Sequence, residues 1–213
     1  MSHIFDWFFG QYQNTPNHLV TLEIIAVIFG LLSVWFSKRD NILVFPTGII
    51  STLIFVYILL VYELLGDMLI NAYYFLMSIY GWILWTRKSD KDSYLPITRL
   101  KTRSEIRNTI LLFFSTLVFV VIVYIVFDKW HTWTAYVDTF TTGIFFIGMW
   151  LMAKKKLENW TFWIIGDIIS VPLYLYKGLI FSSFQYIIFT AIAYYGLKAW
   201  QKHINEPNKS LLK

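Results

Sequence analysis

Seven long apolar stretches follow one another along this chain, separated by short polar connections. They cover residues 20–36, 42–62, 67–85, 108–127, 136–153, 160–177 and 179–198. Each is close to the ~20 residues that an α-helix needs to cross a hydrocarbon core ~30 Å thick. The pattern therefore predicts an all-α polytopic membrane protein with seven transmembrane helices.

The lysines and arginines are distributed unevenly among the connections. Sixteen of the 18 follow the first, third, fifth and seventh stretches, which places them on one side of the membrane. Basic residues favour the cytoplasmic side. We therefore expect the N-terminus to lie outside and the C-terminus to lie in the cytoplasm.

The composition agrees with a membrane protein and argues against several other functions. Only 15% of the 213 residues are charged, and the chain contains no cysteine. A soluble domain carries ~25% charged residues. The four histidines lie outside the apolar stretches, and no phosphate-binding loop or pair of catalytic groups stands within them. We therefore expect no enzymatic activity, no cofactor, no metal site and no nucleic-acid partner.

Two parts of the chain resemble each other. When the sequence is shifted by 118 positions, Gly48 falls on Gly166, and with a shift of 115 positions Trp85 falls on Trp200. Such matches run in register through two units of three predicted helices each. The sequence therefore predicts an internal repeat.

The fourth stretch belongs to neither repeat and consists almost entirely of Leu, Val, Ile and Phe. A single helix between two three-helix units gives both units the same orientation in the membrane. Repeats arranged in this way place a transporter's binding site between them, near the midplane. The predicted organisation is an N-terminal extracytoplasmic or interfacial segment (1–19), a first repeat (20–86), a basic cytoplasmic linker (87–107), a linker transmembrane helix (108–127), a second repeat (136–200) and a cytoplasmic tail (201–213).

The sixth stretch carries aromatic and polar side chains on one helical face. Five residues follow one another here at intervals of three or four positions: Trp160, Trp163, Asp167, Ser170 and Tyr174. Indole rings attract cations and stack on other rings, and a carboxylate offsets positive charge. This face predicts a slot for a flat, polar or cationic ring. The alternative is an aromatic belt at the membrane interface, although a belt does not need an acid within the membrane.

Four further polar residues are candidates for the same site, because polar groups within a membrane are costly unless they face a partner or a cavity. Asn159 stands just before the face on the sixth stretch. Asn41, Asn71 and Gln185 stand in or beside the second, third and seventh stretches. The predicted substrate-binding set therefore has eight members, these four together with Trp160, Trp163, Asp167 and Tyr174.

The same motifs carry a resemblance to a known family. They are Glu-Asn-Trp-Thr-Phe-Trp at 158–163, Asp167, Pro172, Tyr-Lys-Gly at 176–178, and Tyr-Gly-Trp at 80–82. Over nearly all of residues 20–200, the chain resembles the PnuC-type bacterial B-vitamin transporters, best known for nicotinamide riboside. The resemblance implies a 3+1+3 helix layout similar to that of SWEET sugar transporters.

The resemblance also implies a mechanism. Members of the family form homotrimers in the bacterial cytoplasmic (inner) membrane and work by facilitated diffusion, without a coupling ion or ATP. A cytoplasmic kinase then phosphorylates the vitamin and traps it. Carried onto this chain, the resemblance makes Trp160 and Trp163 ring-stacking residues, and it makes Asn159, Asp167, Tyr174, Asn41 and Asn71 polar contacts.

One departure from the family pattern bears on the ligand. Members that carry nicotinamide riboside often have asparagine where this chain has Asp167, and acidic variants look like members suspected of carrying thiamine. Both vitamins are cationic heteroaromatics, so an acid among indoles suits either. The leading hypothesis is a nicotinamide riboside transporter, and a thiamine transporter is the alternative. A vitamin-binding capture subunit or sensor is the hypothesis from another class.

Overall fold

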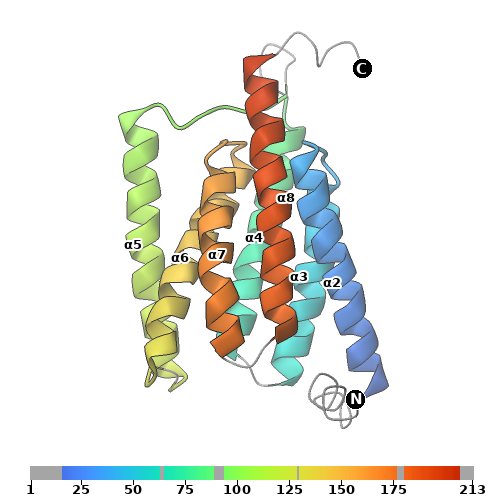
Figure 1. The fold of residues 1–213 in the computed structure, drawn as a ribbon, viewed down its shortest axis with the longest axis vertical. Helices are drawn as coiled ribbons and strands as arrows, with labels where there is room; N and C mark the ends of the chain where they lie inside the picture. Colours follow the sequence, from blue (N-terminus) through green and yellow to red (C-terminus); the bar gives the residue numbers. More distant parts are fainter. Residues whose placement is uncertain (1–15, 63–64, 89–93, 129, 177–179, 207–213) are drawn as a thin grey trace.

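The computed structural model describes residues 16–62, 65–88, 94–128, 130–176 and 180–206. These residues form seven helices: α2 (Asn17–Lys38), α3 (Val44–Val61), α4 (Leu65–Thr86), α5 (Arg103–Val126), α6 (Trp133–Ala153), α7 (Asn159–Tyr176) and α8 (Ile180–Asn205). They run up and down through one bundle (Figure 1). Five of them, α2 to α6, are long and apolar enough to cross a membrane. The predicted all-α fold is confirmed, whereas most of the predicted segment 1–19 lies outside the described residues.

Six helices form a closed ring, and α5 lies outside it. Neighbours in the chain pack together within α2–α3–α4 and within α6–α7–α8, and contacts of α2 with α8 and of α4 with α6 join the two groups. The α5 helix packs on α6 at the edge of the bundle (Figure 1). We call the end of the bundle that carries Arg39, lysines 154–156 and Lys202 the basic end; it lies at the top of Figure 1.

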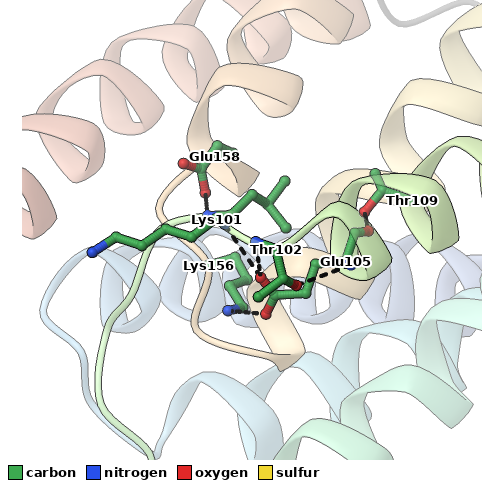
Figure 2. Close-up of polar contacts among 7 residues, drawn as sticks. Lys101, Thr102, Glu105, Thr109, Lys156 and Glu158 are labelled. Atoms are coloured by element: carbon green, nitrogen blue, oxygen red, sulfur yellow. Dashed lines mark hydrogen bonds and ion pairs between the residues drawn. The ribbon is translucent and has the colours of Figure 1, made fainter.

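The start of α5 is set by a capping box rather than by the apolar pattern. The helix begins at Arg103, before the fourth apolar stretch, because the Thr102 hydroxyl accepts the N–H of Glu105 and the Glu105 carboxylate accepts the N–H of Thr102. The same carboxylate pairs with Lys156, in the loop between α6 and α7 (Figure 2). A polar N-terminal turn therefore precedes the apolar part of the helix.

The connection between α4 and α5 is tied to that same loop. The Thr98 N–H donates to the carbonyl of Lys155 at 3.0 Å, and the Thr98 carbonyl accepts the N–H of Leu157 at 2.8 Å. Further along, the N–H of Leu100 donates to the Glu158 carboxylate at 2.9 Å. These bonds attach the linker to the second group of helices at the basic end.

Matching glycines in the third helix of each group receive an aromatic ring from the second helix. The Phe45 ring lies directly against Gly81, and a Cβ at Gly196 would lie 2.6 Å from Cη2 of Trp160. Both rings are fully buried, so neither can move aside. The repeat seen in the sequence thus corresponds to one packing device used twice.

Replacing Gly196 by alanine is expected to lower the melting temperature of the purified protein. The added methyl would collide with the buried Trp160 ring, and overpacking of this kind costs about 1–3 kcal/mol. The matched control is Gly143→Ala, where the new Cβ would meet the tip of Leu117 at 2.9 Å and the edge of the Phe113 ring at 3.0 Å. Both side chains are only half-buried and lie on α5 at the edge of the bundle, so they have room to move. Equal losses of melting temperature in the two variants would contradict the packing argument.

Candidate substrate site

A cavity of about 250 Å³ lies within the ring, and all six ring helices line it. Its wall differs between the two halves of the molecule. The first half contributes mainly small residues: Gly30, Ser33, Ser37, Gly48, Ser51, Thr52 and Ser78. The second half contributes mainly rings and one acid: Phe145, Trp160, Trp163, Asp167, Tyr186 and Phe189. The small side chains of the first half thus leave room for the cavity, and the rings of the second half form its flat wall.

The rings of the second half present flat faces in a row. The Trp163 ring lies over Gly148, where a Cβ would be only 3.1 Å from it. The Phe145 ring stacks between those of Trp163 and Tyr186, with ring centroids 5.6 Å and 6.0 Å apart, respectively. Such faces bind a planar cation or another aromatic ring. This wall can therefore hold a heteroaromatic ligand.

Asp167 places a carboxyl group among these rings. Its side chain is 2% exposed, and no other acid and no lysine, arginine or histidine lines the cavity in the described part of the chain. Asp167 stands eight residues into α7, which is ~12 Å from the start of that helix at the basic end. An acid at this depth calls for a cation or for hydrogen-bond donors beside it.

Six hydroxyl side chains of the first half line the cavity, and most of them offer it an acceptor rather than a donor. Four of them already donate their single hydrogen to backbone carbonyls at 2.7–2.8 Å: Ser33, Ser51, Thr52 and Ser78. A hydroxyl in that state has only lone pairs left to offer. The Ser33 and Ser78 oxygens lie 3.0 Å and 3.3 Å from the position of a Cβ at Gly48, so the missing side chain leaves them room.

Three of the eight predicted site residues line the cavity, namely Trp160, Trp163 and Asp167. Tyr174 lies behind this wall, where its ring centroid is 4.9 Å from that of Tyr186 and the two side chains are hydrogen-bonded. The structure therefore brings the central part of the predicted helical face to the cavity.

The other four predicted residues are not among the described residues of the cavity wall. The Asn41 side chain accepts the N–H of Leu43 at 2.9 Å, just before α3 begins. The buried Asn159 amide donates to the carbonyl of Lys156 at 2.6 Å, at the start of α7. Two more stand on the third helix of their half: Asn71 on α4 and the half-buried Gln185 on α8. Asn41 and Asn159 therefore occupy matching positions, where each forms a hydrogen bond at the start of the second helix of its half.

Residues of the first helix are the main part of the wall that the sequence analysis missed. Gly30, Ser33 and Ser37 follow one another on α2 at intervals of three and four residues, which is a helical face of small and polar residues. That spacing was the available signal. Tyr186 of α8 was also missed, because a tyrosine among apolar residues carries no such pattern.

The fold and the cavity define a class of protein: a polytopic helical bundle with a cavity between two repeats, which is how many membrane transporters are built. The sequence model of the nicotinamide mononucleotide transporter family matches residues 20–202. The chain belongs to this family.

Two curated relatives and one solved structure are similar to the chain. The nicotinamide riboside transporter PnuC of Escherichia coli (strain K12) is 24% identical over 205 residues and covers 84% of each chain. The riboflavin/roseoflavin transporter RibM of Streptomyces davaonensis is 25% identical over 187 residues and covers 86% of each. The crystal structure of the vitamin B3 transporter PnuC matches with a TM-score of 0.63 and 21% identity, covering 89% of this chain and 84% of that one. The family resemblance and the multi-pass membrane fold are thereby confirmed.

Proposed function

We propose that this protein carries a small cationic B vitamin across the membrane by facilitated diffusion, with nicotinamide riboside as the first candidate. The observation that carries the proposal is the buried acid beside stacked rings: Asp167, Trp163 and Phe145 line one wall of the cavity. The positive pyridinium ring of nicotinamide riboside can stack on the rings while the carboxylate offsets its charge. A relative with this transport activity supports the choice.

A riboflavin-like ligand is less well matched, although one relative is a riboflavin transporter. Riboflavin is a tricyclic ring system without a positive charge, so it would leave the Asp167 carboxylate without a cation. The buried acid on the cavity wall therefore favours a cation.

Thiamine is the second candidate, and the same carboxylate supports it. Thiamine joins a positive thiazolium ring to an aminopyrimidine. Its amino group is a hydrogen-bond donor. Acceptors for it are available on the cavity wall, in the hydroxyl oxygens of Ser33, Ser51, Thr52 and Ser78. Nicotinamide riboside brings donors of its own, the carboxamide and the ribose hydroxyls. Both candidates therefore have the positive charge and the hydrogen-bond donors that the cavity favours. Binding measurements are needed to distinguish between the two vitamins.

The proposal includes direction and cellular setting. Basic residues favour the cytoplasm, so we place the basic end and the linker 87–107 there, with the N-terminal segment outside. The repeats then extend over 20–86 and 136–200 as the sequence suggests. Phosphorylation by a cytoplasmic kinase would keep the gradient directed inward, and a homotrimer is the proposed assembly.

The ligand proposal is tested by binding to the purified protein. We expect nicotinamide riboside or thiamine, but not riboflavin, to raise the melting temperature and to quench tryptophan fluorescence. Binding of neither cation, or preferential binding of riboflavin, would refute the proposed ligand class. Uptake into liposomes that contain this chain alone distinguishes a transporter from a capture subunit, because a capture subunit binds the vitamin without moving it.

The acceptor role of the first half is tested by Ser78→Ala. Its hydroxyl bonds within its own helix, to the carbonyl of Tyr74, so the fold should tolerate the change. We expect about fivefold weaker vitamin binding, because one hydrogen bond contributes ~1 kcal/mol. Thr190→Ala removes an equivalent bond within α8, to the carbonyl of Tyr186, and serves as the control. Equal effects on affinity in the two variants would argue against an acceptor at Ser78.

A further inference from the structure

Three buried tryptophans lie together at the basic end of the bundle. Trp85, Trp160 and Trp200 belong to one apolar cluster with residues from both halves of the molecule. The Trp200 ring lies edge-on to that of Trp160, with ring centroids 5.5 Å apart, and 6.2 Å from that of Trp85. We call these three tryptophans the indole cap; one of them, Trp160, lines the cavity.

Two of these indoles make reciprocal hydrogen bonds between the halves. The N–H of Trp85, near the end of α4, donates to the carbonyl of Ala153, the last residue of α6, at 3.1 Å. The N–H of Trp200 on α8 donates to the carbonyl of Ser37, near the end of α2, at 3.1 Å. The last carbonyls of a helix have no partner within that helix. Each half thus caps the first helix of the other, through tryptophans that match in the repeat.

An ion pair joins the halves at the same level. Asp40 and Lys155 each stand one residue beyond a helix C-cap, in matching loops, with φ of 52° and 50°. Their side chains meet at 2.8 Å, with 27% and 9% of their surfaces exposed, respectively. The ammonium group also lies 4.2 Å from the Trp85 ring centroid. The pair thus connects equivalent points of the two repeats beside the indole cap.

We infer that these three contacts are a gate: the Asp40–Lys155 pair and the two reciprocal indole bonds hold the cavity closed at the basic end, and they separate when the cavity opens there. Rocking of one repeat against the other is the motion that such folds use for alternating access. All three contacts cross between the repeats, so this motion breaks them together. Each contact alone changes the equilibrium between the closed and the open state only several-fold, so thermal motion is enough to open the gate.

The gate is tested by the accessibility of a cavity residue, without any vitamin. The chain has no cysteine, so Ser78→Cys introduces a single thiol into the cavity wall. A membrane-impermeant maleimide is applied to proteoliposomes from each side in turn, and Lys202→Cys in a parallel sample reports which side holds the basic end. In the Ser78→Cys background we expect Asp40→Asn to speed labelling from the basic side about fivefold. Asparagine removes the charge and still tolerates the left-handed backbone.

Further variants separate a gate from general loosening. Trp85→Phe and Trp200→Phe remove the donor and keep a ring, and each should also speed labelling severalfold. Exchanging the charges, Asp40→Lys with Lys155→Asp, should restore slow labelling. The matched control is Glu105→Gln, because the Lys156–Glu105 pair uses the neighbouring lysine but does not join the repeats. Unchanged labelling in Asp40→Asn and both tryptophan variants, or an equal rise in Glu105→Gln, would overturn the inference, whichever vitamin the protein binds.

Discussion

Replacing Asp167 by asparagine is expected to cost the protein most of its affinity for cationic vitamins. The two side chains have almost the same shape, so the cavity keeps its form and loses only the charge. Truncating one partner of a buried charge pair costs about 2–5 kcal/mol, and each 1.4 kcal/mol is tenfold in Kd. We therefore expect Kd to rise by at least ~30-fold, measured by calorimetry or by the shift in melting temperature with ligand.

The affinity for an uncharged ring of similar size provides the control for this variant. Nicotinamide has a similar ring without the positive charge, so we expect the affinity for nicotinamide to change little or to improve in Asp167→Asn. An equal loss of affinity for charged and uncharged ligands would mean that the residue supports the fold rather than the charge of the ligand. A variant that keeps its affinity for nicotinamide riboside and loses its affinity for thiamine would identify thiamine as the ligand that Asp167 serves.

Replacing Trp163 by alanine is expected to have the second large effect. The indole lies on Gly148 and next to the Phe145 ring, so its removal takes a flat face from the cavity wall. Stacking contributes about 0.5–1.5 kcal/mol, and a desolvated cation–π contact about 2 kcal/mol. Together they contribute about 2.5–3.5 kcal/mol, so we expect roughly 60- to 300-fold weaker binding of a cationic vitamin. Trp163→Phe should recover part of that loss, because a phenyl ring keeps some of the face.

The matched control is a tryptophan on the outside of the bundle. Trp82 on α4 is 41% exposed and does not line the cavity in the described part of the chain. Trp82→Ala should leave the vitamin affinity unchanged. If Trp163→Ala and Trp82→Ala lose vitamin affinity to the same degree, the loss comes from unfolded protein. That outcome would contradict a role of the Trp163 ring in binding the vitamin.

The two halves of the molecule have diverged within one plan. Gly81 and Gly196 both receive a ring from the second helix of their own half, and Trp85 and Trp200 both cap the opposite half. The cavity wall does not follow this symmetry, because one half lines it mainly with small residues and the other with rings and Asp167. The two halves thus match in their internal packing and in the contacts at the basic end, and they differ in the residues with which they line the cavity.

The predicted helices and their order agreed with the structure, and their ends did not always agree. The apolar pattern marks the part of a helix that suits lipid, whereas caps and backbone hydrogen bonds set where the helix begins. The pattern therefore missed the first turn of α5, which Thr102 and Glu105 cap. It also missed the last residues of α8, which continue to Asn205.

The sequence by itself determined the membrane class, the seven helices, the repeat, the family and the aromatic, acid-bearing face of α7. These follow from local periodicity and from motifs, which are readable along one chain. Only the tertiary structure decided which residues of the first half face that helix. Asn41 lies at the entry to α3, Ser33 and Ser51 line the cavity, and Asp40 meets Lys155 across the basic end. Such pairings depend on how the two repeats pack against each other, and no single helix carries that information.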